Sequence, residues 1–481
     1  MRKEVVRLEN VSQQLDGDYY LKDINLYILE GEIVGFITSE AKGKRELIQI
    51  LEKNIPITYG KVYVNNRMVN SYAHSSLQEN KVYVISQQST LVSDLTVYDN
   101  LFVLRKGFRQ NILNKKILRS QTARIMKEFG LEIKPETVAM YLKPIDRCLV
   151  ELIRAHLSGC GLVILNDCNN FLGNDDIQRL QVMIGKLCQR QMAFLYMGNH
   201  HEDVFKVSHR SVLFANGQIK KIFVQNEMDD EHIDPYIIKF PTASSETVEE
   251  RKEEVLKLED LEYHNLRGLN LSVRKGECVT ILDNDNNVIN DFLDVLTKGE
   301  KPSSGDIWLK GKIYTPKMSR NFLLNGVGVI EDDPVHTMIF PELSVIENLA
   351  FLLDRKIDCT VVKKRYYESV EEEYYPLIGE AIREVDVQEL QYEDLYKLVY
   401  YRMHLYHPDL VVCVAPFAHG DMNCRQIICR LIQQLKEIGI SVILLQVNIS
   451  DSMAVADRLY VVHEGTITKR YNKEEFYLIE R

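Results

Sequence analysis

Residues 32–47 read EIVGFITSEAKGKREL, an apolar strand-like run followed by small residues, a Gly-Lys pair and the start of a helical pattern. This order is typical of a phosphate-binding loop, in which amide N–H groups at a helix N-terminus and a lysine hold phosphate oxygens. Gly43 and Lys44 supply the end of that pattern. Thr38 stands where its first glycine belongs, and Arg45 stands where a Ser or Thr would hold Mg²⁺. An ordinary strand-loop-helix turn fits the same residues, so the loop alone leaves phosphate binding open.

The chain repeats itself once, at a spacing of roughly 245 to 250 residues, which is too long for a solenoid and suits a duplicated domain. Four motifs of the first half return in the same order in the second. The pairs are VRLENV and LKLEDL (6–11 and 256–261), LYILEGE and LSVRKGE (26–32 and 271–277), LTVYDNL and LSVIENL (95–101 and 343–349), and the closing His209-Arg210 to Gly217 and Asp457-Arg458 to Gly465. Four ordered matches predict two copies of one domain.

Composition narrows the class of protein. The chain has 481 residues, of which 45% are hydrophobic and 27% charged, so a disordered or low-complexity chain is excluded. The net charge of −10 argues against a nucleic-acid partner. Nine cysteines without a Cys-x-x-Cys pair argue against a zinc site and fit a reducing cytoplasm. Because the first residues lack a signal-peptide core and no long apolar run occurs, we expect a cytoplasmic protein without a transmembrane segment of its own.

Element patterns indicate an α/β fold in each half. Alternating residues around the early glycines predict antiparallel strands. Continuous apolar runs suit strands buried on both faces of a parallel sheet, and they lie at 161–165, 193–197, 410–414 and 441–445. Helical patterns lie at 44–53, 111–130 and 175–190. The polar, charged stretch 241–254 reads as a linker, whose tail could instead form a short helix, so the predicted domains are 1–240 and 255–481.

Further motifs resemble those of one family. GKVYVNN (60–66) resembles a hairpin of the nucleotide-binding subunits of ABC transporters, and VISQQ (84–88) resembles their Q-loop, with Gln87 at the Mg²⁺-sensing glutamine. The whole chain is similar to the fused two-cassette subunit of bacterial importers for ribose, galactose or xylose. This resemblance implies two tandem ABC-type nucleotide-binding domains, each with an antiparallel β subdomain and a helical subdomain. It also implies ATP and Mg²⁺ as cofactors and membrane permease subunits as partners.

The catalytic motifs of that family are eroded in both halves. Where the signature Leu-Ser-Gly-Gly-Gln should stand, the sequence reads LKPID (142–146) and LQYED (390–394), and bulky residues there obstruct a close backbone approach to phosphate. Asn166 replaces the Mg²⁺-binding aspartate and is a weaker, neutral ligand. Asp167 replaces the glutamate that polarises water and is one methylene shorter. Asn199 replaces the switch histidine.

The second half departs further. Its phosphate-loop region reads TILDNDNNVIN (280–290), with no Gly and no Lys, and we expect Asp283 and Asp285 to face the phosphate position and repel nucleotide. Its base strand continues into Ala415 and Pro416 without a carboxylate, and Val447 stands at the switch position. The resemblance therefore limits ATP and Mg²⁺ to the first site, where Gly43, Lys44, Arg45, Gln87 and Asn166 would bind cofactor and Asp167 is the one candidate catalytic residue.

These observations favour a non-hydrolysing pseudo-ATPase that acts as a scaffold or regulator through protein partners, with at most weak ATP binding at the first site. The alternative is an ATP-binding subunit that energises or supports carbohydrate import together with permease subunits, bound to the inner face of the cell membrane. ABC ATPases of translation or DNA repair are disfavoured, because they depend on the missing motifs. The sequence indicates no metal-ligand cluster.

Overall fold

The computed structural model describes residues 2–15, 18–38, 43–75, 77–103, 114–236, 253–357, 364–420, 422–449 and 452–479. The chain divides into two compact units, Met1–Ile238 and Lys239–Arg481. Most of the predicted linker and part of the first phosphate loop lie outside the described residues, as does the start of the predicted helix 111–130. The last residue of the predicted linker, Glu254, begins a strand rather than a helix.

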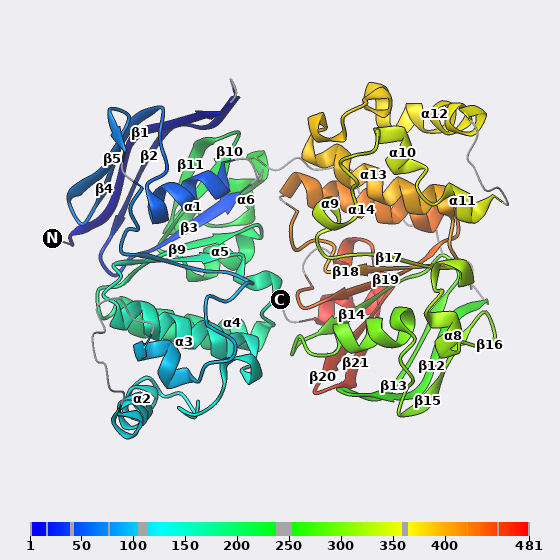
Figure 1. Ribbon diagram of the computed structural model, residues 1–481, viewed down its shortest axis with the longest axis horizontal. Coiled ribbons are helices and arrows are strands. Elements are labelled where there is room, and N and C mark those ends of the chain that lie inside the picture. Colours follow the sequence, from blue (N-terminus) through cyan, green and yellow to red (C-terminus); the bar gives the residue numbers. More distant parts are fainter. Residues whose placement is uncertain are drawn as a thin grey trace. The chain divides into compact units, whose positions relative to one another are not determined.

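The first unit contains two sheets (Figure 1). The antiparallel sheet has the order β2-β1-β4-β5-β6 and comprises β1 (Glu4–Leu15), β2 (Asp18–Leu29), β4 (Tyr59–Val64), β5 (Arg67–Ser71) and β6 (His74–Ser75). The six-stranded sheet has the order β11-β10-β3-β9-β8-β7 and comprises β3 (Ile33–Thr38), β7 (Val82–Ile85), β8 (Leu162–Asn166), β9 (Ala193–Gly198), β10 (Arg210–Ala215) and β11 (Gln218–Val224). All its neighbours pair in parallel except β10 and β11.

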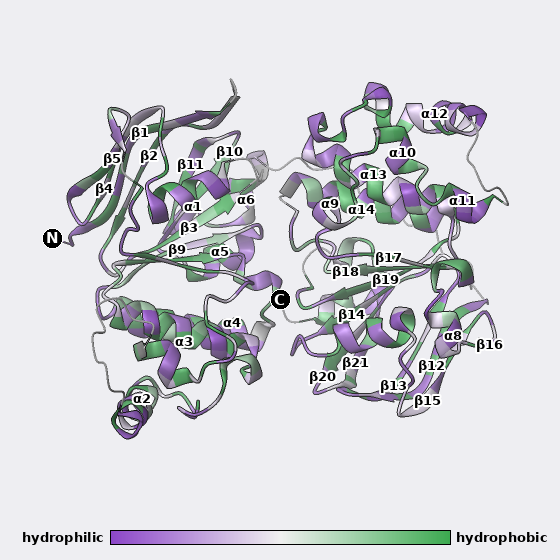
Figure 2. Cartoon of the chain, viewed as in Figure 1, coloured by the Kyte–Doolittle hydropathy of each residue, from purple (hydrophilic) through white to green (hydrophobic). Residues whose placement is uncertain are grey.

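Helices cover both faces of the six-stranded sheet. The helices are α1 (Lys44–Lys53), α2 (Lys115–Phe129), α3 (Pro144–Leu157), α4 (Asn174–Cys188), α5 (His201–Val207) and α6 (Asp230–Ile233). Leu47, Ile50 and Leu51 of α1 pack with the antiparallel sheet on one face, while α3 and α4 pack together on the other (Figure 1). Figure 2 shows hydrophobic residues along the central strands and hydrophilic ones on the outward sides of the helices. The core is therefore built on both sides of the buried parallel strands.

The second unit repeats this plan. Its antiparallel sheet has the order β13-β12-β15-β16, with β12 (Glu254–Tyr263), β13 (Leu266–Arg274), β15 (Ser304–Leu309) and β16 (Lys312–Ile313). Its six-stranded sheet has the order β17-β18-β19-β14-β20-β21, with β14 (Cys278–Asp283), β17 (Val327–Ile330), β18 (Leu410–Val414), β19 (Ser441–Gln446), β20 (Arg458–His463) and β21 (Thr466–Asn472). The six-stranded sheet has the strand order of the first unit, and the antiparallel sheet has the same order without a counterpart of β6, so the α/β tandem fold predicted from the repeat is confirmed.

The helices of the second unit are α7 (Ile289–Leu293), α8 (Pro316–Ser319), α9 (Pro334–Thr337), α10 (Val345–Leu349), α11 (Leu353–Lys356), α12 (Lys364–Ile378), α13 (Tyr392–Tyr406) and α14 (Met422–Glu437). Successive residues of β18 alternate between two cores: Val411 packs with α13 and α14, and Val412 packs with the antiparallel sheet. The helix after the phosphate-loop region is the main irregularity. The α1 helix is regular over 10 residues, whereas α7 has 5 and runs into a π-helical turn, Asp294–Lys298.

Candidate functional site

The predicted site residues of the first unit gather where three parallel strands end beside the start of α1. Thr38 ends β3, Asn166 ends β8 and Asn199 follows β9. Lys44 is the first residue of α1. Ligands of open α/β sheets bind at the carboxyl ends of the strands. The fold therefore brings these four residues to the edge of the sheet where a ligand site is expected.

Gly43 fixes the backbone just before α1. It has a φ of 89°, and a Cβ at this position would lie 2.2 Å from the carbonyl oxygen of Tyr20. Any other residue would therefore be strained and would also collide with the backbone of β2. The Gly43 carbonyl accepts the Leu47 N–H at 3.0 Å, which closes the first turn of the helix. Glycine here sets the direction in which the Lys44 side chain leaves the loop.

The Lys44 ammonium is paired with Asp167. Its Nζ lies 2.7 Å from Oδ1 and 2.6 Å from Oδ2 of Asp167. Both side chains are mostly buried, with exposed fractions of 11% and 23%. The carboxylate that stands in place of the water-polarising glutamate therefore binds the lysine that would hold phosphate. Both residues were predicted from the sequence to lie at one site, but only the structure shows that they pair directly.

Asp167 is held by its backbone in an uncommon conformation. Its φ is 53° and its N–H donates to the carbonyl of Met197 at 3.0 Å. Ala415 follows β18 as Asp167 follows β8, and it has the same left-handed backbone, with a φ of 39° and an N–H bond of 2.7 Å to Leu445. Non-glycine residues rarely adopt this region. The turn is thus a shared feature of both units, and only the first unit places a carboxylate on it.

The remaining polar groups of the first site differ in their partners. Thr38 Oγ1 donates to Asn199 Oδ1 at 2.9 Å. Asn166 Oδ1 is buried and accepts no hydrogen bond from any residue that the structure describes. An orphaned buried oxygen at the position of the magnesium ligand is a group that a hydrated cation could satisfy. The first site therefore retains residues that fit a Mg²⁺–phosphate group, Asn166 for the metal and Gly43 with Lys44 for phosphate.

Two predicted residues stand apart from this cluster. Arg45 is exposed on α1 and Gln87 is exposed in the loop after β7. Among the described residues, no hydrogen bond or ion pair joins Gln87 to Lys44 or Asp167. The loop beyond Gln87 is anchored instead to α3, because Thr90 donates its N–H and Oγ1–H to the Glu151 carboxylate at 2.7 and 2.6 Å. Burial raises the pKa of Glu151, and the Thr90 bonds act against that rise.

A polar network that the sequence did not indicate lies next to Asp167. The Asn169 amide donates to Asp203 Oδ2 at 2.6 Å, and the Tyr196 hydroxyl donates to Asn169 Oδ1. Burial raises the pKa of Tyr196 well above its usual value, so its hydroxyl remains protonated and serves as the donor. Asn169 thus ties the turn after β8 to β9 and α5. No sequence motif marks this network, because its members are 27 and 34 residues apart.

The corresponding region of the second unit is filled by its own side chain. Asp283 ends β14, and its Oδ2 accepts the N–H groups of Asn287, Val288 and Ile289 at 2.8, 2.7 and 3.3 Å. Its side chain is completely buried. These amides lead into α7 and correspond in position to the N–H groups that cradle phosphate in a phosphate-binding loop. A carboxyl oxygen of the protein occupies the place of an anion.

The structure corrects the predicted orientation of one aspartate of this loop. Asp283 lies at the phosphate position, as we expected, where it accepts the amides before α7, but Asp285 turns away to the β20–β21 turn. Asp285 Oδ2 accepts the Glu464 N–H at 2.6 Å and pairs with His463 at 3.2 Å. Unpaired amides at the start of α7 attract the first carboxyl group, which explains the difference. Ile289 occupies the helix position of Lys44, so these residues do not fit a nucleotide phosphate.

No group of three or more His, Cys, Asp or Glu side chains in the described part of the chain could hold a metal ion. No helix among the described residues is long and apolar enough to cross a membrane.

Comparisons with known proteins agree with this architecture. A family model described as ABC transporter matches residues 21–169. The ribose import ATP-binding protein RbsA of Clostridium perfringens (strain SM101 / Type A) is 21% identical, over 98% of this chain and 96% of its own. RbsA of Geobacillus kaustophilus is 22% identical, over 96% and 95%. The xylose import ATP-binding protein XylG of Moorella thermoacetica is 21% identical, over 98% and 96%.

Solved structures show the same two-cassette fold. A structure of the archaeal ribosome recycling factor aABCE1 with the ribosomal stalk protein aP1 matches with a TM-score of 0.58 at 16% identity, over 98% of this chain and 92% of that one. A model of ribosome-bound archaeal Pelota and ABCE1 matches with a TM-score of 0.63 at 15% identity, over 97% and 79%. The chain is therefore similar, over almost its whole length, to ribose and xylose import ATP-binding proteins, and it has the ABC nucleotide-binding fold in tandem.

Proposed function

We propose that this chain is a non-hydrolysing member of an ABC-type assembly, a scaffold or regulator that binds ATP weakly and only at its first site. One observation carries the proposal: in each unit, a carboxyl group of the protein engages the groups that would hold phosphate. In the first unit Asp167 holds the ammonium of Lys44. In the second unit Asp283 holds the amide N–H groups before α7.

At the first site, nucleotide must compete with Asp167. The ammonium has two short contacts to one carboxylate in a mostly buried setting, where ion pairs are weakly screened. A phosphate oxygen approaching Lys44 meets the negative charge of Asp167 at the same time. Gly43 and the unpartnered Asn166 oxygen still suit a Mg²⁺–phosphate group. The balance supports binding that is weak and dependent on Lys44.

At the second site, neither the lysine nor the loop amides that would bind phosphate are available. No lysine stands at the start of α7, where Ile289 is mostly buried. The three amides already bond to Asp283. Freeing them would leave a buried carboxyl group without its partners, which costs about 1–3 kcal/mol or more. This arrangement supports a second site closed to nucleotide.

Hydrolysis needs groups that neither unit supplies in position. Both oxygens of Asp167 contact Lys44, so the carboxylate is turned to the lysine and not to a water. Asn199 bonds to Thr38 in place of a histidine aimed at the γ-phosphate. Loss of a single preorganised charge-stabilising group raises a barrier by about 3–4 kcal/mol. The absence of several such groups supports a chain that does not turn over ATP at a useful rate.

The binding half of this proposal is tested by titration with a fluorescent ATP analogue, with and without Mg²⁺. Wild type and Lys44→Ala are compared, together with Arg45→Ala as a matched control that removes an exposed charge from the same helix. We expect weak, saturable binding that Lys44→Ala abolishes and that Arg45→Ala changes little. Binding that is unaffected by Lys44→Ala would contradict the assignment of the first site.

A second candidate function is support of sugar import together with membrane permease subunits. It is favoured by the end-to-end match to the ribose import ATP-binding protein, which covers 98% of this chain and 96% of the relative. In that case the chain would lie at the cytoplasmic face of the membrane, held by its permease. Tagged chain purified from detergent-solubilised membranes tests this candidate. A stoichiometric integral membrane partner supports import, whereas recovery from the soluble fraction without one favours the scaffold.

A further inference from the structure

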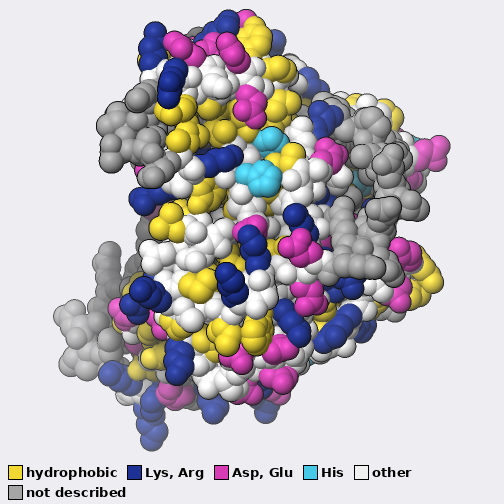
Figure 3. Space-filling view, turned by 90° about the vertical axis from the view of Figure 1, so that its right-hand side faces the viewer, with side chains coloured by type: hydrophobic (Ala, Val, Ile, Leu, Met, Phe, Trp, Pro, Cys, Tyr) yellow, Lys and Arg dark blue, Asp and Glu magenta, His cyan; other side chains and the backbone are white. Residues whose placement is uncertain are grey.

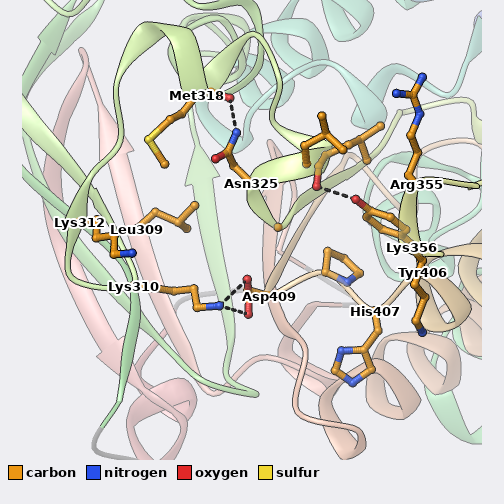
Figure 4. Close-up of a pocket in the computed structure, with 14 residues that line it drawn as sticks. Leu309, Lys310, Lys312, Met318, Asn325, Arg355, Lys356, Tyr406, His407 and Asp409 are labelled. Carbon is orange, nitrogen blue, oxygen red and sulfur yellow. Dashed lines mark hydrogen bonds and ion pairs between the residues drawn. The ribbon is translucent and has the colours of Figure 1, made fainter. Parts of the chain in front are cut away.

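A cavity of about 470 Å³ opens on the second unit, away from the phosphate-loop region. It lies where the β15–β16 turn, α11 and the segment between α13 and β18 meet, at the amino ends of β17 and β18 (Figure 4). Phosphate-loop sites lie at the opposite, carboxyl edge of such a sheet. The cavity is therefore separate from both predicted nucleotide sites. Its volume is within the range of small-molecule pockets.

Cationic side chains stand on opposite sides of this cavity. Lys310 and Lys312 line one side and Arg355 and Lys356 line the other (Figure 4). Among the described residues of the lining, Asp409 is the single carboxylate, and its two oxygens accept from Lys310 Nζ at 2.9 and 3.0 Å. The described lining residues therefore carry a net positive charge, although the whole chain has a net charge of −10. Figure 3 looks onto the side of the molecule that carries α11 and β16 and shows Lys and Arg side chains interspersed with hydrophobic and acidic ones.

The cations differ in how firmly they are held. Lys356 Nζ donates to the Leu405 carbonyl at 2.6 Å, which fixes it and leaves further N–H groups for a ligand. Arg355 is 3.7 Å from Asp354 and is 58% exposed. Lys312 makes no ion pair within the described part of the chain. Arg355 and Lys312 therefore keep most of their hydrogen-bonding capacity for an incoming anion.

Apolar groups form the remaining surface. Tyr406 is fixed by the bond from its hydroxyl to the Leu323 carbonyl at 2.7 Å, so its ring is presented in one orientation. Met318 and Leu324 line the same cavity, and Leu324 is 61% exposed. Because Leu324 is exposed in a lining that also carries cationic side chains, it can contact the carbon skeleton of a ligand, which an inorganic ion lacks.

One lining segment of this cavity differs from its counterpart in the first unit. The segment that precedes β8 in the first unit is Ser158, Gly159, Cys160 and Gly161, whereas the segment that precedes β18 is Tyr406, His407, Pro408 and Asp409. Gly159 and His407 both have left-handed backbones, with φ of 69° and 60°. The first unit uses glycine for this turn, and the second places an imidazole there at some backbone cost.

One glycine makes room for the carboxylate of the cavity. Gly326 has a φ of 82°, and a Cβ there would lie 2.3 Å from Asp409 Oδ2. The Asp409 N–H also donates to the Gly326 carbonyl at 2.8 Å. This close approach places the carboxylate where it orients Lys310. The cavity is thus shaped by at least two positions with special backbone, Gly326 and His407.

We propose that this cavity binds a small phosphate monoester with an apolar or ring-shaped body. A phosphate dianion entering the cavity would draw the exposed Lys312 and Arg355 side chains toward it from the two sides, with Lys310 and Lys356 adding charge. Lysine and arginine are the usual phosphate-binding side chains, arginine in a bidentate manner. The body of the ester would lie on Tyr406 and Leu324. The site is independent of the proposed nucleotide binding, which concerns Lys44 in the other unit.

Isothermal titration calorimetry of the full chain with phenyl phosphate tests the proposal. Inorganic phosphate and phenol serve as the two half-ligands. We expect saturable binding of phenyl phosphate with a dissociation constant below about 1 mM, tighter than either half-ligand. The double variant Lys312→Gln with Arg355→Gln should bind about tenfold or more weakly, the change that loss of a charge-assisted hydrogen bond brings. Both side chains are exposed, so the fold should be retained.

Two control variants locate the binding. Lys116→Gln with Lys127→Gln makes the same charge change on exposed residues of α2, and Lys44→Ala removes the lysine of the first phosphate loop. Neither should change phenyl phosphate affinity. Absence of saturable binding to wild type, or an equal loss in the α2 double variant or in Lys44→Ala, would overturn the proposal. Equal affinity for inorganic phosphate would overturn the role of the apolar surface.

Discussion

The Lys44 ammonium and the Asp167 carboxylate form a two-contact ion pair of 2.6 and 2.7 Å between the first residue of α1 and the turn after β8. The two residues are 123 positions apart and meet because β3 and β8 flank β9 in one parallel sheet. The pair ties the residue that would bind phosphate to the residue that would activate water. It gives a physical reason for the weak nucleotide binding that we propose, which the sequence substitutions alone do not provide.

Substitution of Asp167 should therefore strengthen nucleotide binding. Asp167→Asn removes the competing charge and keeps the size of the side chain, so the affinity for ATP should rise roughly fivefold, which corresponds to about 1 kcal/mol. Titration of wild type and variant with a fluorescent ATP analogue measures the change. The double variant Asp167→Asn with Lys44→Ala should lose the gain. An unchanged or lower affinity in the single variant would show that Asp167 does not restrain Lys44.

Gly43 should be intolerant of substitution. Gly43→Ala places a Cβ 2.2 Å from the Tyr20 carbonyl at a φ of 89°, and strain of this kind costs about 1–3 kcal/mol of unfolding free energy. Gly159→Ala is the matched control, because Gly159 has a φ of 69° but open space around its Cβ position. Urea denaturation should show a clearly larger loss for Gly43→Ala than for Gly159→Ala. Equal losses would mean that the contact with Tyr20 has no energetic effect.

Asp283 should stabilise the second unit. Asp283→Ala leaves three amide N–H groups without their acceptor, so the free energy of unfolding should fall by about 1–3 kcal/mol. Chemical denaturation measures this loss, and Asp283→Asn, which keeps an acceptor oxygen, should recover part of it. Asp285→Ala is the comparison within the same loop and should cost less, because Asp285 is partly exposed. A larger loss for Asp285→Ala would contradict the role of Asp283.

The Asp283 carboxyl group should also make the stability of the second unit depend on pH. Burial raises the pKa of Asp283 above its ordinary value of 3.8, although the amide N–H bonds act against this shift. An acid whose pKa is higher in the folded state contributes stability that is complete below its unfolded pKa and is lost as pH rises through its folded pKa. Melting temperatures should therefore fall, relative to those of Asp283→Asn, as pH rises above the ordinary value of 3.8 and through the raised pKa of Asp283. A difference that stays constant or grows over this range would contradict the shift.

The architecture could be predicted from the sequence because it rests on local patterns that occur twice. Buried strands appear as continuous apolar runs, and the segment LSVIENL of the second half resembles the segment LTVYDNL of the first. The tandem α/β fold follows from these signals. Residues such as Gly43, Lys44 and Asn166 could also be placed at one sheet edge, because the carboxyl ends of parallel strands meet there.

Side-chain partners could not be predicted in the same way. The sequence identified Asp283 and Asp285 as loop residues. The orientation of their side chains depends on which backbone amides lack a partner, and those amides are known only once the structure shows that α7 begins at Ile289. The pairing of Lys44 with Asp167 depends on a left-handed turn for which the sequence carries no glycine signal. The basic cavity draws its lining from the β15–β16 turn, α11 and the end of α13, which no motif connects.

The central claim is that both phosphate-binding regions are engaged by carboxyl groups of the protein and that ATP is not hydrolysed. The most direct measurement is release of inorganic phosphate from Mg-ATP by purified wild type, with Lys44→Ala and Asp283→Ala prepared in parallel. We expect wild type to release no more phosphate than Lys44→Ala does. Phosphate release that is well above background in wild type and is abolished by Lys44→Ala would contradict it.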